Sequence, residues 1–193
     1  SLKKLIKNTL LSLAPKLIKK RVFAPYDSLS WQSLSKSEFD AELLLLEFFL
    51  NPKSIFFDVG TNKGEYALYS EKLIDPSRIY LFEPERHLNK QLRSIFNKCH
   101  VSTIALSDKK GTNRFKIPVI NGIVDNCLST LEVDNIEENE TESVIYEVET
   151  DTIDNFTKTR HLSPDLIKID VEGHELSVLK GGDEYIRKKH PTL

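Results

Sequence analysis

Apolar residues recur at helical spacing at the start of the chain. Between residues 2 and 21, leucine and isoleucine return every three or four positions and lysines fill many of the remaining places, which predicts an amphipathic helix interrupted at Pro15. A second helix is predicted over residues 37–50, with acidic residues in its early turns and Asn51-Pro52 at its end. We therefore expect an N-terminal helical extension or cap over residues 1–50.

Beyond residue 50 the pattern changes to short apolar runs that alternate with helical stretches. Runs typical of buried strands lie at residues 55–57, 79–82, 101–106 and 166–169. Helical patterns lie at residues 64–73 and 87–97 and from residue 174 onward. Because right-handed crossovers place helices on the faces of a parallel sheet, this alternation predicts an α/β fold. Its sheet should be doubly wound and mostly parallel, with helices on both faces.

Residues 110–156 break this alternation. Strand-like runs at residues 114–117 and 144–148 flank an acid-rich stretch between Leu131 and Glu142, which predicts a mobile, solvated loop. A chain of 193 residues is long enough for one core and an extension. We expect one domain over residues 51–193, with a β-rich insertion at 110–156.

Composition and charge exclude several classes of protein. With 39% hydrophobic and 29% charged residues, the chain is typical of soluble globular proteins. The net charge of -2 gives no argument for a nucleic-acid partner. The two cysteines lack the spacing of a zinc site or a disulfide framework, and we expect no metal. No apolar run approaches the roughly 20 residues of a membrane span, so we expect a cytoplasmic protein.

Two interpretations of residues 1–21 remain open. The segment is either a cap packed on the domain with solvated lysines, or a basic amphipathic helix on an anionic membrane surface or a partner. The second interpretation would make the protein membrane-associated at its periphery. The sequence does not indicate an oligomeric state.

The segment from Phe57 to Tyr66 holds the first candidate binding residues. It lies where the first buried strand turns into a helix, the edge at which open α/β sheets bind ligands. Gly60 allows a tight turn and a close ligand, and Gly64 lets the helix pack closely on the strand. Free amides there suit a carboxylate, and Asp58 suits an ammonium group. The structural alternative is a plain glycine turn with Asp58 capping the helix.

Glu83 stands at the end of the second predicted strand, 25 positions after Asp58, and Pro84 stiffens the turn that follows. A carboxylate at this place can accept hydrogen bonds from two adjacent ribose hydroxyls. The loop has Asn62 where the dinucleotide fingerprint has its second glycine, so a pyrophosphate fits poorly. These features favour S-adenosylmethionine over NAD.

Four motifs resemble those of the FkbM family of S-adenosylmethionine-dependent methyltransferases. They occur in the family's order and spacing at Asp58–Gly64, Phe82–Pro84, Ala105–Asp108 and Ile167–Glu175. The resemblance spans about residues 54–182 and implies a Rossmann-like class I methyltransferase fold with S-adenosyl-L-methionine as cofactor. It also implies O-methylation of a hydroxyl on a sugar, polysaccharide or secondary-metabolite acceptor. Family members continue beyond the equivalent of His190-Pro191, so we expect a sheet truncated at its C-terminal end.

The resemblance also assigns parts of the cofactor to individual residues. Asp58, Gly60 and Asn62 would line the methionine end, Glu83 the ribose, and Ser107 with Asp108 the adenine. The full set of cofactor-binding candidates is Asp58, Gly60, Thr61, Asn62, Gly64, Tyr66, Glu83, Pro84, Ser107 and Asp108.

Asp170, Glu172 and His174 crowd the end of the last predicted strand. Methyl transfer requires an aligned acceptor and a group that takes its proton. We expect Asp170 to face the cofactor and Glu172 to take the proton or orient the acceptor, with His174 as the alternative base. In the structural alternative, Asp170 positions the cofactor, Glu172 caps the next helix and His174 is merely exposed. Asp170 and Glu172 could also bind a divalent metal, but a third ligand is missing.

Two other functions fit part of the sequence. An NAD-dependent oxidoreductase shares the topology and the acid after the second strand. A non-catalytic module would dock on a membrane or partner through the basic N-terminal helix. Neither explains the block from Asp170 to Glu175 as well as a methyltransferase does.

Overall fold

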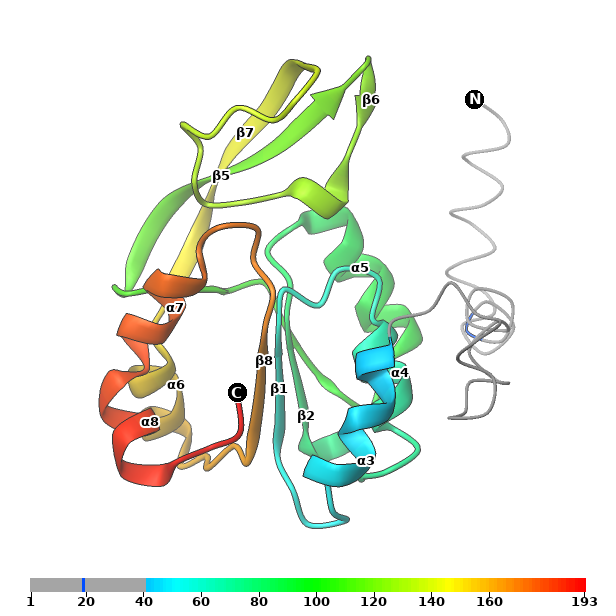
Figure 1. Cartoon of the computed structure of the whole chain (residues 1–193), viewed down its shortest axis with the longest axis vertical. Coiled ribbons are helices and arrows are strands. Elements are labelled where there is room, and N and C mark those ends of the chain that lie inside the picture. Colours follow the sequence, from blue (N-terminus) through cyan, green and yellow to red (C-terminus); the bar gives the residue numbers. More distant parts are fainter. Residues whose placement is uncertain (1–18, 20–40) are drawn as a thin grey trace.

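The computed structural model describes Lys19 and residues 41–193 (Figure 1). The helix predicted over residues 2–21 and the start of the helix predicted from residue 37 lie outside the described residues, apart from Lys19. Lys19 forms an ion pair with Glu71, and its ammonium nitrogen lies 4.7 Å from the centre of the Phe96 ring. In the described part of the chain, no helix has the length and apolar character needed to cross a membrane.

A four-stranded parallel sheet, here called the central sheet, has the order β3-β2-β1-β8 (Figure 1). Its strands are β1 (Phe56–Val59), β2 (Ile79–Phe82), β3 (His100–Ser102) and β8 (Leu166–Ile169). Their register places Asp58 of β1 beside Leu81 on one side and Lys168 on the other. The predicted α/β fold with a mostly parallel sheet is confirmed.

Helices cover both faces of the central sheet (Figure 1). One side carries η3 (Ala41–Leu45), α3 (Leu46–Phe49), α4 (Glu65–Ser70) and α5 (Arg86–Ile95), and η4 (Pro76–Arg78) precedes β2. The other side carries α6 (Ile153–Arg160), α7 (Glu175–Gly181) and α8 (Asp183–Lys189). Strand periodicity divides the core: Phe56 packs among the first group of helices, and Phe57 packs against Phe156 and Val178 of the second group.

The predicted insertion and the preceding β4 together form a second sheet with the order β4-β7-β5-β6. Its strands are β4 (Ala105–Leu106), β5 (Gly111–Ile120), β6 (Ile123–Val124) and β7 (Glu140–Asp151), and η5 (Asn126–Leu128) follows β6. The single strand expected at 101–106 was wrong, because its last two residues leave the central sheet and pair with β7. The insertion also ends earlier than expected, since Ile153 already begins α6.

The acid-rich stretch is attached to the second sheet. We call residues 131–139 the acidic loop. The Lys116 side chain is buried, pairs with Glu140 at 2.8 Å and donates a hydrogen bond to the Asn135 carbonyl. Thr130 and Lys116 also exchange two backbone hydrogen bonds of 2.9 and 3.0 Å. Most residues of the acidic loop are exposed, as expected for a solvated loop, but the contacts of Lys116 attach the loop to the second sheet, which the charge count did not reveal.

Side-chain caps connect the helices that lie next to β8. Thr152 begins α6 by accepting a hydrogen bond from the Asn155 amide at 3.0 Å. Asp154 accepts hydrogen bonds from the amides of Glu184 and Tyr185, in the first turn of α8. After α8, Thr192 forms a parallel bridge with Leu166. These contacts hold α6 and α8 to each other and the chain after α8 to β8.

Candidate cofactor and catalytic site

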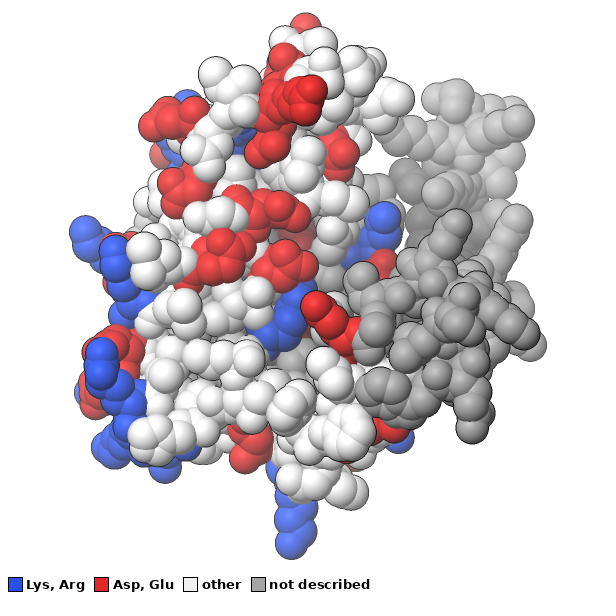
Figure 2. Space-filling model, viewed as in Figure 1, with Lys and Arg blue, Asp and Glu red and all other residues white. Residues whose placement is uncertain are grey.

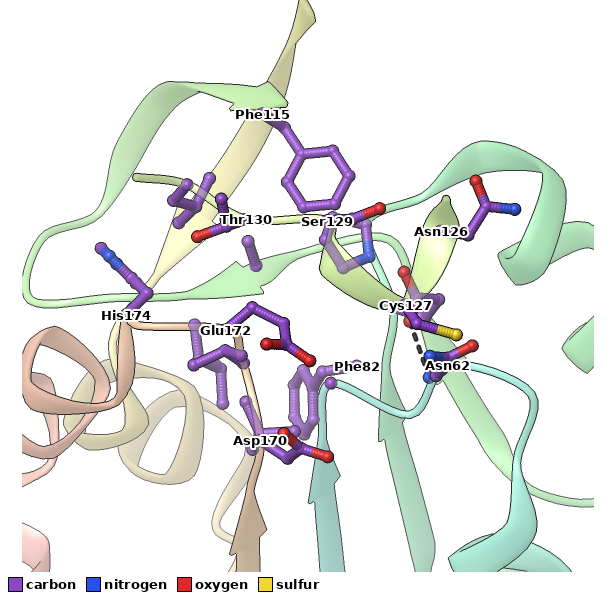
Figure 3. A pocket seen from close by; sticks show the side chains of 18 residues that line it. Asn62, Phe82, Phe115, Asn126, Cys127, Ser129, Thr130, Asp170, Glu172 and His174 are labelled. Atoms are coloured by element: carbon purple, nitrogen blue, oxygen red, sulfur yellow. Dashed lines mark hydrogen bonds between the residues drawn. The ribbon is translucent and has the colours of Figure 1, made fainter. Parts of the chain in front are cut away.

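A pocket lies between the carboxyl ends of β1, β2 and β8 and the second sheet (Figure 3). Its apolar wall consists of Val59, Phe82, Ala105, Leu106, Phe115, Leu131 and Val171. Its polar wall includes predicted residues from every strand end, namely Gly60, Asn62, Glu83, Pro84, Asp170, Glu172 and His174. The remaining wall comes from η5 and the residues after it, Asn126, Cys127, Ser129 and Thr130.

The turn after β1 depends on Gly60. Its φ angle is +77°, and a Cβ atom there would collide with the backbone oxygen of Asp170. The amides of Gly60 and Thr61 donate to the Phe82 carbonyl at 3.1 and 3.2 Å, and the Asn62 amide donates to Glu83 Oε2 at 2.8 Å. The amides of Gly60, Thr61 and Asn62 are therefore engaged within the protein and are not free for a ligand carboxylate. The turn presents the Asn62 side chain to the pocket instead.

Three predicted residues of this segment, Thr61, Gly64 and Tyr66, do not line the pocket. Gly64 is needed because a Cβ atom would collide with Phe96 and Leu92, so its close contact is with the α5 side and not with the strand as predicted. Thr61 donates its hydroxyl to the Asp58 carbonyl at 2.9 Å, and the Tyr66 hydroxyl lies 3.1 Å from a Glu42 oxygen. Their roles in cofactor binding remain predictions.

Lys168 links the two acids at the strand ends. Its ammonium lies 3.3 Å from Asp58 Oδ1 and 3.4 Å from Asp170 Oδ2, and it donates to the Gly60 carbonyl at 2.8 Å. Burial raises the pKa of Asp58, an effect that Lys168 partly offsets. Burial opposes the charge of Lys168, yet the two carboxylates raise its pKa. The ammonium that Asp58 attracts is thus this lysine, and Asp58 does not line the pocket.

Glu83 is held in place by two backbone amides. It is 5% exposed, and its oxygens accept hydrogen bonds of 2.8 Å from the amides of Asn62 and Glu85. Burial raises the pKa of Glu83 to about 7 despite these hydrogen bonds. Since each carboxylate oxygen has a further lone pair, Glu83 can still accept donors from the pocket.

Glu172 and His174 have opposite orientations at the end of β8. Glu172 has a φ angle of +49° and reaches toward the middle of the pocket, whereas the His174 ring points away from it (Figure 3). Among the described residues, nothing forms a hydrogen bond or ion pair with the Glu172 carboxylate. Its pKa is raised first by partial burial and then by the negative charges of Asp170, Glu175, Glu137 and Asp125.

His174 is buried between two hydrogen-bond partners. Its Nδ1 lies 2.6 Å from Glu132 Oε1, and its Nε2 lies 2.9 Å from the Ser107 hydroxyl. The alternative that His174 is merely exposed was therefore wrong. Ser107 and Asp108, predicted beside adenine, do not line the pocket, whereas the preceding Ala105 and Leu106 do.

Sequence reasoning missed the contributions of Lys168, Glu132 and the η5 segment. Lys168 had a usable signal, because it stands two residues before Asp170 on one strand and so shares its face. Glu132 and η5 had none, because they reach the site only through the pairing of the second sheet. In the described part of the chain, no group of three or more His, Cys, Asp or Glu side chains could hold a metal ion.

A parallel sheet with a glycine turn after its first strand and a buried acid after its second defines a Rossmann-like protein. Residues 58–193 match a protein family that is described as the Methyltransferase FkbM domain. The chain belongs to this family.

A crystal structure with a similar fold is that of the methyltransferase FkbM from Methylobacillus flagellatus KT. The TM-score is 0.50 and the sequence identity is 17%, so the likeness concerns the fold alone. It covers 86% of this chain but only 36% of that protein. A comparison with curated proteins gives no match.

Proposed function

We propose that the chain binds S-adenosyl-L-methionine in this pocket and transfers its methyl group to a hydroxyl of a small-molecule or glycan acceptor. One observation carries the cofactor assignment. Two buried atoms of pocket residues, Asn62 Oδ1 and Ser129 Oγ, have no hydrogen-bond partner among the described residues. Because a buried polar atom without a partner is costly, the pocket suits a ligand that brings its own hydrogen-bonding groups.

The pocket residues fit the parts of this cofactor. Glu83 would accept hydrogen bonds from the ribose hydroxyls, and Asn62 Oδ1 would accept one from the ammonium of the methionine end. Phe82, Leu106 and Phe115 offer an apolar surface for the adenine ring. An NAD ligand could also use Glu83, but the amides of Gly60, Thr61 and Asn62 are already engaged and are not available to its pyrophosphate.

The bound cofactor supplies a methyl group on a sulfonium, which is a good leaving group. The protein must then align the acceptor oxygen and accept its proton. Glu172 suits the second task, because its carboxylate is unpaired among the described residues and its raised pKa makes it a stronger base. Asp170 suits alignment, because Lys168 restrains its carboxylate at 3.4 Å.

Calorimetric titration with S-adenosylhomocysteine, S-adenosylmethionine and NAD tests the cofactor assignment. We expect both sulfur ligands to bind and NAD to bind more weakly. Tighter binding of NAD would contradict the proposal and favour an oxidoreductase. Transfer of a labelled methyl group to a panel of simple glycosides then tests the acceptor class, with the Glu172→Gln variant as the control for enzymatic transfer.

A further inference from the structure

His174 joins three segments that are far apart in the sequence. The residue is 6% exposed, and its ring contacts Ser107 after β4 and Glu132 of the acidic loop. His174 itself ends the turn after β8, here called the 171–174 turn. The imidazole therefore connects the candidate catalytic turn of the central sheet with the second sheet.

These partners determine where the ring carries its protons. An ionised Glu132 only accepts hydrogen bonds, so Nδ1 of His174 must donate to it. Nε2 then accepts from the Ser107 hydroxyl in the neutral ring or donates to the Ser107 oxygen in the charged ring. Both nitrogens are engaged in either state. The ring also points away from the pocket (Figure 3), so His174 is not placed to take a proton from an acceptor.

Glu132 lies in a part of the acidic loop that is held by hydrogen bonds to neighbouring residues. Its amide donates to Thr130 Oγ1 at 3.0 Å, and Thr130 pairs through its backbone with Lys116 of β5. Further along, Glu140 accepts hydrogen bonds from the buried Lys116 ammonium at 2.8 Å and from the Glu137 amide at 2.9 Å. The carboxylate that meets His174 is therefore held by the second sheet.

The 171–174 turn needs such an anchor. Glu172 has a φ angle of +49°, which is unfavourable for a residue with a side chain. The amides of Val171 and Gly173 both donate to Glu175 Oε1, at 3.0 and 3.2 Å, which closes the turn from the α7 side. His174 fixes the opposite side, and Glu172 points into the pocket (Figure 3).

We propose that Glu132 and Ser107 are positioning residues, which act through His174 to hold the 171–174 turn with Glu172 directed into the pocket. The importance of Glu172 rests on the proposed function. The link between Glu132, His174 and Ser107 exists in the free protein and is testable without an acceptor.

The experiment is nuclear magnetic resonance on protein carrying ¹⁵N-labelled histidine and ¹³C-labelled glutamate. It reports which His174 nitrogen carries the proton and at which pH Glu172 titrates, with assignments from His174→Asn and Glu172→Gln. The test variants are Glu132→Ala and Ser107→Ala. Glu132→Gln keeps an acceptor for Nδ1, and Glu138→Ala removes an exposed acid of the same loop as a matched control.

We expect His174 to be protonated at Nδ1 in the wild type, in Glu132→Gln and in Glu138→Ala. Glu132→Ala should lose the Nδ1 proton signal, and the pKa of Glu172 should fall toward the ordinary range of a glutamate. The pKa falls because the released turn carries the carboxylate out of its partly buried position and away from the negative charges of Asp170, Glu175, Glu137 and Asp125. Ser107→Ala should lower the pKa of Glu172 in the same direction.

A wild-type His174 protonated only at Nε2 would overturn the assignment. So would a folded Glu132→Ala protein in which Glu172 titrates as in the wild type. If Glu132→Ala does not fold, the same Glu172 titration in Ser107→Ala decides. Calorimetry with S-adenosylhomocysteine on the same samples separates the two proposals. A wild type that does not bind this ligand contradicts the proposed function and leaves the His174 measurement interpretable.

Discussion

The carboxylate of Glu83 both holds the backbone of two turns and lines the pocket. Two amides hold its oxygens at 2.8 Å, and its remaining lone pairs can meet the ribose of the proposed cofactor. Replacing Glu83 with Ala should weaken S-adenosylhomocysteine binding by about 1.5–3 kcal/mol, the usual range for hydrogen bonds to charged groups. Calorimetry measures this loss. An unchanged dissociation constant in folded Glu83→Ala protein would remove Glu83 from the site.

The ionisation of Glu83 should make cofactor binding depend on pH. Burial raises the pKa of Glu83 to about 7 from an ordinary 4.5, so the carboxyl of the free protein is largely protonated at lower pH. Ribose hydroxyls favour the ionised form, and binding should therefore release a proton at about pH 6 and almost none at about pH 8. Affinity should rise as pH increases through this range.

Calorimetry in buffers with different ionisation enthalpies counts the released protons. Glu83→Gln is the matched control, because it keeps the shape of the side chain and cannot ionise. Proton release of equal size in the wild type and in Glu83→Gln would assign the ionisation to another group.

Gly60 sets how closely the first turn approaches β8. A Cβ atom at this position would collide with the Asp170 backbone, and φ is +77°. Gly60→Ala should lower the free energy of unfolding by at least about 2 kcal/mol, from backbone strain and overpacking together. Gly122→Ala is a matched control with the same φ of +77° and no atom near its Cβ, so it reports backbone strain alone. Equal losses in chemical denaturation would show that the contact with Asp170 adds nothing.

Among the elements, α8 depends on a cap from another helix. Asp154 of α6 accepts hydrogen bonds from the amides of Tyr185 at 2.8 Å and Glu184 at 3.2 Å. Asp154→Ala should cost about 0.5–2 kcal/mol in the free energy of unfolding, as lost helix caps do, whereas Asp154→Asn should keep most of the stability. Thermal and chemical unfolding of both variants check this. Equal losses in the two variants would contradict the capping role.

The strands that sequence patterns predicted well are those that are largely buried. β1, β2 and β8 are mostly apolar runs between turn residues, interrupted only by Asp58 in β1 and Lys168 in β8, and such runs become strands covered on both faces. β4 was merged with β3 because a strand of two residues carries no periodicity, and its partner β7 is chosen by tertiary pairing.

The site residues were likewise predicted where the local sequence pattern determines their position and missed where tertiary pairing does. Residues at the strand ends, such as Glu83 and Asp170, line the pocket as their positions in the pattern required. Glu132 was missed because it lies 42 residues from His174 in an acid-rich stretch that resembles solvated surface. The backbone pairing of Thr130 with Lys116 of β5 brings it to the imidazole.

On the scale of the whole molecule, the pocket lies between two cores of unequal size. The central sheet is packed on both faces, whereas the second sheet covers one small cluster of buried residues, Ala105, Phe115, Ile117, Leu131 and Val148. Acidic side chains gather on the face in Figure 2 over the second sheet and the pocket region. Because the second sheet buries less apolar surface than the central sheet, it should open at a lower free energy.

This difference predicts how a ligand changes local stability. Hydrogen exchange followed by mass spectrometry should show weaker amide protection in β5 and β7 than in β1 and β2 of the free protein. S-adenosylhomocysteine at about 100 times its dissociation constant should add about 2.7 kcal/mol to every opening that destroys the pocket. Protection should then rise in β5, β7 and residues 126–131. Openings confined to α8 leave the pocket intact, so α8 is the internal control. If β1 alone gained protection, the ligand would contact only the central sheet, and the second sheet would not form a wall of the binding site.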